Sequence, residues 1–425
     1  MAALMRVART LRNHWKKSVF FTGAAIWGGN FLLDRYKADL LREEYCKEAQ
    51  LYGRQLSSNI AKPIKATVFV NPAAKKGKGK KLFEKNAAPL LHLAGLDVEI
   101  IQTTTEGEAK DLAGSLDATD IIVIAGGDGT VAEVVTGLLR RDDEQAISSK
   151  WTLGVIPVGV TNSLARSLYA DAEADVRWMC NAAMAIIKGL TRQVDVMSIQ
   201  DEEHGRKSYA MSSIHWGPLQ DAKEKATKFW YFGPLKHRFS FIWAGLTQES
   251  PSVVRGHISY GHPKEIPEPP SQASQGWWTR LMNRLWPRKK EPEPEVNDPS
   301  EEEIMEELDI SAVECSILTD LSGTPREGPP ALQLQTGPSE LSRTDFIKEG
   351  WTRLAGKGHT DIYKATDIPV GEVHLTPKIE EGKDSWYTID NERFEAMPIT
   401  VKILPSKLRF FTNRSQEGQE VELKR

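Results

Sequence analysis

Apolar runs alternate with helix-like segments in the first half of the chain. Four short apolar runs occur at residues 66–70, 97–101, 120–125 and 152–156. Runs of this kind are typical of parallel strands that are covered on both faces of a sheet. Helical patterns fall between and after them, at residues 81–94, 108–116, 131–140 and 174–188. The repetition predicts a Rossmann-like α/β domain.

The pattern changes beyond about residue 199. Short runs of β-branched and aromatic residues, separated by Pro, Gly and Asp, lie at residues 208–216, 238–243, 252–260, 309–318, 384–390 and 397–404. Such spacing predicts a β-rich antiparallel sandwich.

The N-terminus combines a basic segment with an uncharged, mostly apolar one. Residues 1–17 contain Arg and Lys but no acidic residue, which is typical of mitochondrial targeting segments. Residues 18–33 are uncharged and would extend about 24 Å as a helix, slightly less than a bilayer core. We expect a membrane anchor here, with a cleaved targeting peptide or a buried helix as alternatives. If the basic side faces the matrix, the body lies in the intermembrane space at the mitochondrial inner membrane.

Length and composition complete the outline. The chain has 425 residues, which predicts more than one core. We expect an N-terminal region at 1–60, an α/β domain at 61–198, a β-rich domain at 199–413 with an insertion at about 265–308, and a tail at 414–425. The net charge of −3 predicts no nucleic-acid partner. The three cysteines are too scattered for a zinc site or a disulfide framework.

The insertion contains a Trp-rich basic segment at residues 276–290, followed by an acidic stretch at 291–309. As a helix, the first segment would place its Trp, Leu and Met residues on one half and its polar residues on the other. This pattern predicts a helix in a membrane interface, or one packed on the protein or a partner. The acidic stretch is predicted to be a solvated linker.

The motif GGDGT at residues 126–130 carries the strongest chemical signal. Its glycines would let backbone N–H groups approach phosphate oxygens before a helix N-terminus. Asp128 would repel phosphate unless it binds a metal or accepts a proton from an attacking hydroxyl, so it is the first catalytic candidate. An ordinary Gly-rich turn is the alternative. The nucleotide-binding candidates in this motif are Gly126, Gly127, Gly129 and Thr130.

Three other strand ends carry candidates for the same site. Ligands of open α/β sheets gather beyond the carboxyl ends of the strands. The candidates are Asn71 before a basic loop, Thr105 after the second strand, and Gly159 after the fourth. A solvated loop or helix caps would explain these residues equally well.

The ordered motifs resemble a known family. An Asn-Pro loop, GGDGT followed by EVVTGL, and P-x-G-x-x-N-x-x-A at 157–165 together resemble the diacylglycerol kinase and sphingosine kinase superfamily of lipid kinases. GGDGT alone also occurs in NAD kinases and phosphofructokinase-like enzymes. The resemblance implies a catalytic domain at 61–198 and a lipid-binding domain at 199–413. It also implies transfer of the ATP γ-phosphoryl group, with Mg²⁺, to monoacylglycerol and diacylglycerol, forming lysophosphatidic and phosphatidic acid.

The resemblance also assigns residues in the second half. Asp195 would contact the lipid headgroup, and Lys236 would contact nucleotide phosphate. Asp390 and Glu392, in a sequence that resembles Asp-Gly-Glu, would assist catalysis or a Mg²⁺ network. The alternatives are a buried hydrogen-bonded Asp195, a surface Lys236, and a hairpin turn at Asp390 and Asn391.

The sequence departs from the family pattern in three places: Ala132 stands where Asn is usual, Gly159-Val160-Thr161-Asn162 stands where Gly-Thr-Gly-Asn is usual and so lacks one glycine, and Asn391 stands where Gly is usual. They motivate an alternative function, a membrane-anchored assembly factor of the inner-membrane carrier translocase with reduced or separate kinase activity. The translocase and the membrane surface are partners implied by the resemblance. A soluble NAD kinase-like enzyme is the other alternative.

Overall fold

The computed structural model describes residues 15–59, 63–105, 107–116, 119–141, 150–169, 175–247, 253–264, 305–321, 328–379 and 385–413. The basic segment before residue 15, the predicted Trp-rich helix at 276–290 and the tail after residue 413 lie outside these ranges. The chain divides into two compact units. The first comprises Met1–Arg192 with Arg409–Arg425, and the second comprises Gln193–Leu408.

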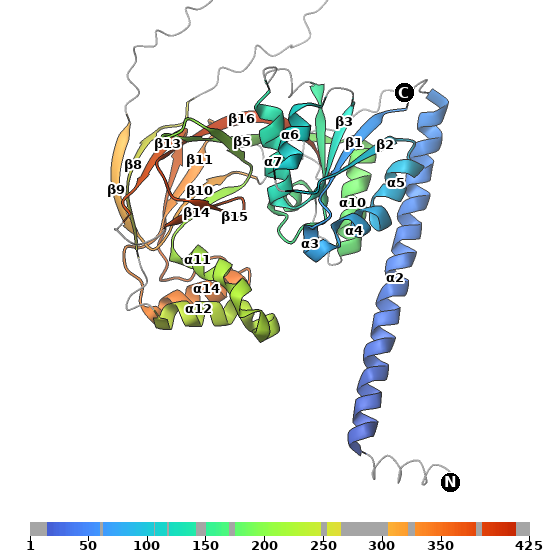
Figure 1. The fold of residues 1–425 in the computed structure, drawn as a ribbon, viewed down its shortest axis with the longest axis horizontal. Coiled ribbons are helices and arrows are strands. Elements are labelled where there is room, and N and C mark those ends of the chain that lie inside the picture. The colour runs from blue at the N-terminus through green and yellow to red at the C-terminus, as the bar shows by residue number, and fades with distance from the viewer. Residues whose placement is uncertain are drawn as a thin grey trace, which may run out of the picture. The chain divides into compact units, whose positions relative to one another are not determined.

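The first unit contains a parallel sheet with the order β2-β1-β3-β4, of which Figure 1 labels β1, β2 and β3. Its strands are β1 (Lys65–Val70), β2 (Asp97–Gln102), β3 (Ile121–Gly126) and β4 (Thr152–Pro157). The four predicted strands are therefore confirmed. The end of β16 (Ile399–Phe411) adds to this sheet, since Phe410 pairs in parallel with Leu153. Because the strands are parallel and in register, their carboxyl ends meet at one edge.

Helices pack on the sheet in two groups (Figure 1). Helix α6 packs against α7, whereas α10 packs against α2, α4 and α5. The helices of this unit are α2 (Trp15–Asn59), α3 (Ala74–Gly77), α4 (Gly79–Asn86), α5 (Ala88–Leu93), α6 (Glu108–Gly114), α7 (Asp128–Leu139), α9 (Ser163–Leu168) and α10 (Asp175–Lys188). In α7, buried Val131, Val134, Val135 and Leu138 form one apolar face, as helical spacing requires.

The helix predicted from residue 131 begins three residues earlier, at Asp128. The GGDGT motif is therefore not a free loop: β3 ends at Gly126, Gly127 is the junction, and the rest forms the first turn of α7.

Helix α2 includes the predicted anchor at residues 18–33 and continues to Asn59. Its later part is bound to other helices of the first unit, because Arg42 Nε donates to Asn86 Oδ1 (2.8 Å) and Lys188 pairs with Glu48 (2.9 Å). Apolar side chains of the earlier part are exposed, among them Trp27. Across the described ranges, no helix has both the length and the apolar content needed to cross a membrane.

The second unit is built on two sheets of mainly antiparallel strand pairs. One has the order β16-β13-β8-β9, with β5 beside β16 and β6, and the other has the order β12-β11-β10-β7-β14-β15. The strands are β5 (Thr191–Asp201), β6 (Lys207–Ala210), β7 (Ser213–Trp216), β8 (Val254–Gly261), β9 (Glu306–Ala312), β10 (Cys315–Thr319), β11 (Leu332–Thr336), β12 (Thr366–Val370), β13 (Glu372–Pro377), β14 (Trp386–Ile389) and β15 (Glu392–Glu395).

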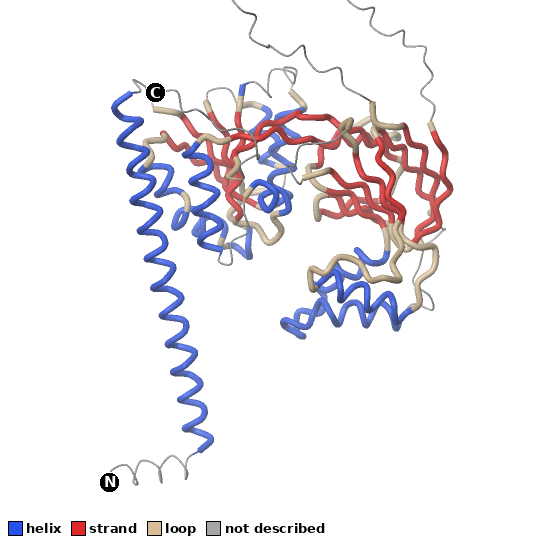
Figure 2. Tube along the Cα trace, turned by 180° about the vertical axis from the view of Figure 1, so that it is seen from behind, coloured by secondary structure: helices blue, strands red, loops and turns tan. Residues whose placement is uncertain are grey.

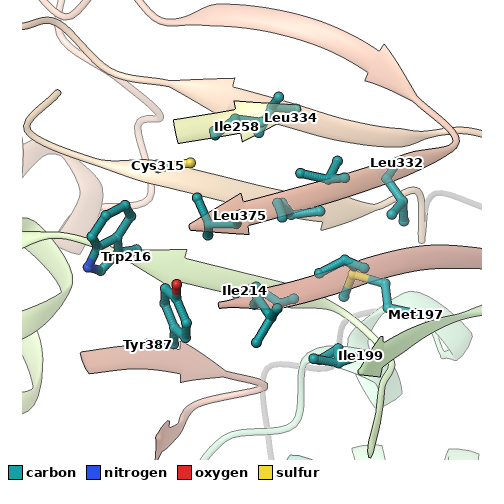
Figure 3. Close-up of a cluster of buried hydrophobic side chains, with 14 of the residues drawn as sticks. Met197, Ile199, Ile214, Trp216, Ile258, Cys315, Leu332, Leu334, Leu375 and Tyr387 are labelled. Atoms are coloured by element: carbon teal, nitrogen blue, oxygen red, sulfur yellow. The ribbon is translucent and has the colours of Figure 1, made fainter. Parts of the chain in front are cut away.

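A single apolar core joins the two sheets (Figure 3). It draws Ile258 and Leu375 from one sheet and Ile214 and Leu334 from the other. Side chains two residues apart along a strand point to the same face, so alternating apolar positions fill this core from both sides. The predicted antiparallel sandwich is confirmed.

A helical layer accompanies the sandwich, and it corrects one prediction. The run at residues 238–243 is not a strand, because it lies in α12 (Lys236–Thr247). Helix α12 packs with α11 (Pro218–Lys225), the 3₁₀ segment η1 (Ala226–Leu235) and α14 (Arg343–Leu354), which gather at one end of the strands (Figures 1 and 2).

Packing explains why the aromatic run is helical. Phe241 lies in a buried cluster with Leu219 and Phe346, and its ring centroid is 6.1 Å from that of Phe346. Gly350 of α14 allows this approach, since an added Cβ there would lie 2.3 Å from Phe241 Cδ1.

Candidate active site

The ends of β1, β3 and β4 are joined by hydrogen bonds in the first unit. Asn71 N donates to Ala125 O (3.1 Å), and Asn71 Nδ2 donates to Thr130 Oγ1 (3.1 Å). Gly159 N donates to Gly126 O (3.1 Å). The structure thus brings together Asn71, GGDGT and Gly159, which lie far apart in the sequence.

Asp128 is buried at the centre of this arrangement and is the first residue of α7. Its N–H donates to Thr161 O (3.1 Å), and its Oδ1 accepts from Ser163 N (2.7 Å). Ser163 begins α9, so the carboxylate lies at the N-termini of two helices, where backbone dipoles favour negative charge.

Two glycines allow the β3 and β4 loops to pass in contact. A Cβ on Gly159 would lie 2.3 Å from Gly127 Cα, and one on Gly127 would lie 2.7 Å from Thr161 O. Side chains are therefore excluded at both positions. N–H groups in the first turn of a helix have no intrahelical acceptor. Those of Gly129 and Thr130 belong to the first turn of α7, which provides an anion-binding end of the kind that holds phosphates.

The loop after β2 is held by two glutamates. Glu108 Oε2 accepts from the N–H groups of Thr104 (2.6 Å) and Thr105 (3.1 Å). The bond from the Thr104 backbone is the main reason why the pKa of Glu108 is lowered. Glu133 of α7 accepts from Gly107 N (3.0 Å), which ties this loop to the helix that begins with Asp128. Thr105 itself is exposed.

The remaining predicted residues belong to the second unit. Asp195 of β5 is buried, and its Oδ1 accepts from Ser406 N (2.8 Å). Ser406 has a φ of 50°, so this bond supports a residue in the left-handed region. Lys236 is half-buried at the start of α12.

Asp390 lies in a two-residue turn between β14 and β15. Asp390 has a φ of 46° and Asn391 a φ of 69°, as in the type I′ hairpin turn that was the alternative interpretation of this sequence. Glu392 follows as the first residue of β15.

The Asp390 carboxylate is buried and accepts four hydrogen bonds. Oδ2 accepts from Met211 N (2.6 Å), and Oδ1 accepts from Ser212 N (2.8 Å), Ser212 Oγ (2.6 Å) and Ser213 N (3.0 Å). The sequence does not predict this clamp, because its donors lie 177 to 179 residues earlier in the chain and no local pattern marks them.

The hydrogen-bond donors around Asp390 limit its role as a ligand of the predicted Mg²⁺. An ionised carboxylate has about four lone-pair positions. Asp390 uses four acceptor positions on backbone and hydroxyl donors, so in this geometry it does not fit a direct Mg²⁺ ligand. Among the residues that the structure describes, no group of three or more His, Cys, Asp or Glu side chains could hold a metal ion.

Comparison with known proteins agrees with the fold. Residues 65–199 match the profile described as diacylglycerol kinase catalytic domain, and residues 211–424 match acylglycerol kinase C-terminal. The chain is 40% identical to the mitochondrial acylglycerol kinases of Mus musculus and Homo sapiens, over 97% of this chain and of each relative. Sphingosine kinase 1 of Arabidopsis thaliana is 32% identical over 42% of this chain and 36% of its own length.

A crystal structure from Bacillus anthracis str. Sterne, assigned as a diacylglycerol kinase, shares the fold with a TM-score of 0.50. It is 18% identical and covers 83% of this chain and 99% of its own. The fold and the matched domains define an ATP-dependent lipid kinase of the diacylglycerol kinase type. Within that class, the chain belongs to the acylglycerol kinase family.

Proposed function

We propose that the protein transfers the γ-phosphoryl group of ATP to the free hydroxyl of monoacylglycerol and diacylglycerol, forming lysophosphatidic and phosphatidic acid. One observation carries the proposal: the ends of β1, β3 and β4 meet around a buried aspartate at a helix N-terminus. This is the combination that phosphoryl transfer requires, with N–H groups for phosphate and a carboxylate for the attacking hydroxyl.

The proposed step uses residues of the first unit. The acceptor hydroxyl oxygen attacks the γ-phosphorus, the bond from that phosphorus to the β–γ bridging oxygen breaks, and ADP leaves. The hydroxyl proton passes to the Asp128 carboxylate. The N–H groups in the first turn of α7 stabilise phosphate charge, while Gly127 and Gly159 allow the close approach. Asn71 holds Thr130 in place, and Thr105 contributes a nucleotide contact.

We assign Asp390 a positioning role, since its carboxylate anchors the turn between β6 and β7. Mg²⁺ arriving with ATP would neutralise phosphate charge. Of the two predicted metal ligands, Asp390 and Glu392, only Glu392 remains a candidate. Asp195 is proposed to contact the lipid headgroup and Lys236 a phosphate.

We further propose that the protein resides at the mitochondrial inner membrane, with residues 18–33 as its anchor and its body in the intermembrane space. The exposed apolar side chains of α2 and the basic N-terminus support this location, as do relatives that are named mitochondrial. Association with the carrier translocase is a second candidate function. It is favoured by the departure at residues 159–162 from the family's Gly-Thr-Gly-Asn pattern, where Val160 is 78% exposed.

The test compares acceptors. The full-length protein is incubated with labelled ATP and either monoacylglycerol, diacylglycerol or NAD. We expect label in both lipids. Label in NAD alone would overturn the lipid assignment in favour of a nucleotide-cofactor kinase. Absence of transfer to any acceptor, together with co-purification of carrier translocase, would instead favour the assembly role.

A further inference from the structure

Helix α12 has two apolar faces. Phe241 points into the buried cluster of the helical layer. Phe239, Trp243 and Leu246 recur at i, i+4 and i+7 and form a different stripe. Trp243 is 51% exposed and Leu246 is 65% exposed. An amphipathic helix of a soluble domain normally turns only one apolar face to its core, so the second stripe calls for an explanation.

The segment η1 extends this stripe. Trp230 is 76% exposed, Tyr231 is 62% exposed and Leu235 is 57% exposed. Their backbone turns at Gly233, which has a φ of 55°. Large apolar side chains are thus presented by two consecutive elements of one unit.

Ring contacts join the two elements into one surface. Centroid distances are 4.8 Å for Tyr231–Phe232, 3.9 Å for Phe232–Phe239 and 6.2 Å for Phe239–Trp243. We call this surface the aromatic face and define it by a set of residues: Phe229, Trp230, Tyr231, Phe232, Leu235, Phe239, Trp243 and Leu246. A contiguous exposed apolar surface is typical of a site for protein or membrane contact.

The charges around the aromatic face favour a membrane over a protein as its partner. From Lys225 to Thr247 the chain carries Lys225, Lys228, Lys236 and Arg238 but no Asp or Glu. Lys225, Lys228 and Arg238 are exposed. Tryptophan and tyrosine favour the boundary between acyl chains and headgroups, and lysine and arginine flanking them favour anionic headgroups.

We propose that the aromatic face is a docking surface for a lipid bilayer that contains anionic lipids. The proposal deepens the proposed function and rests on it for its purpose, because an acylglycerol acceptor resides in a bilayer. Trp230, Tyr231 and Leu246 enter the interface, while Lys225 and Lys228 contact the headgroups.

The binding test uses the full-length chain and sedimentation with phosphatidylcholine vesicles, with or without anionic phosphatidylserine. We expect Trp230→Ser with Tyr231→Ser to weaken vesicle binding about tenfold or more. Lys225→Gln with Lys228→Gln should weaken it roughly tenfold on anionic vesicles only, and more at low than at high salt. Ile362→Ser, an exposed apolar residue outside the face, is the matched control and should bind as wild type does.

A local probe separates this surface from the apolar part of α2. An environment-sensitive fluorophore is attached at Leu246→Cys, or at Ile362→Cys as the control, in a Cys46→Ser background. We expect anionic vesicles to shift the emission to the blue only for the probe at position 246. An unshifted probe overturns the proposal. So does vesicle binding that neither variant pair changes, or a face whose variants alter only self-association or protein capture.

An activity measurement tests the docking surface separately from the kinase function. The Trp230/Tyr231 variant should lose activity on acylglycerol in vesicles but retain it on a short-chain, monomeric acylglycerol. A blue shift at position 246 in a protein that phosphorylates no lipid would retain the docking surface and reject the proposed function. If the variant keeps normal activity on acylglycerol both in vesicles and as monomer, and the probe at position 246 shows no blue shift, the proposed function is retained and the docking surface is rejected.

Discussion

Asp128 and Asp390 are both buried and both lie next to a tight change of chain direction, yet their surroundings differ. Asp128 begins a helix after a glycine-rich strand end, where loops from three parallel strands meet. Asp390 lies in a left-handed turn of an antiparallel hairpin and accepts four hydrogen bonds from Met211–Ser213. We therefore propose two purposes for the same type of side chain: chemistry at Asp128 in the first unit, and attachment of one turn to another at Asp390 in the second.

The largest effect is expected for Asp128→Asn. An amide oxygen can still accept from Ser163 N, but the side chain cannot take a proton, so kcat should fall about 10²- to 10⁴-fold. Transfer of label from ATP to monoacylglycerol measures this, with thermal unfolding to show that the fold is kept. The exposed Asp111→Asn serves as the control. An Asp128→Asn enzyme with wild-type kcat would contradict a catalytic role for Asp128, and with it the proposed difference from Asp390.

Asp390→Ala should act mainly on stability. It leaves three N–H groups and one hydroxyl without their acceptor, so we expect a loss of about 3 kcal/mol in the free energy of unfolding. Urea unfolding measures this. A variant of unchanged stability whose Mg²⁺ requirement rises sharply would show instead that Asp390 acts through the metal.

Gly159→Ala should have an intermediate effect. The added Cβ would overlap with Gly127 Cα, so the β3 and β4 loops must separate, at a cost of about 2 kcal/mol and with weaker ATP binding. Calorimetric titration with ATP and thermal unfolding measure both effects. Val160→Ala is the neighbouring control, because Val160 is exposed. Equal effects at both positions would contradict the proposed contact between the loops.

The smallest effect is expected for Asn391→Gly. Position 391 has a φ of 69°, where glycine carries no steric cost, so stability should change by no more than about 0.5 kcal/mol. Kinase activity should stay the same, as the turn keeps its shape. A marked gain in activity would show that the departure from the family's Asp-Gly-Glu pattern restrains catalysis.

Prediction succeeded where signals are local. The apolar runs that became β1 to β4 can be identified within a few residues, and parallel strands necessarily bring Asn71, GGDGT and Gly159 to one edge. It failed at residues 238–243, where aromatic residues favour a strand. Tertiary packing overrides this preference, because Phe241 joins the buried cluster with Phe346 from a helix.

The layered α/β domain, the order of the strand-end motifs and the family can all be predicted from the residues alone, because periodicity and glycine spacing act over short distances. The three-dimensional fold was needed to show that Gly127 and Gly159 lie in contact, that Asp390 clamps Met211–Ser213, and that the second stripe of α12 is exposed. Each of these depends on segments far apart along the chain. Their meeting is set by packing and hydrogen-bond satisfaction across the whole unit.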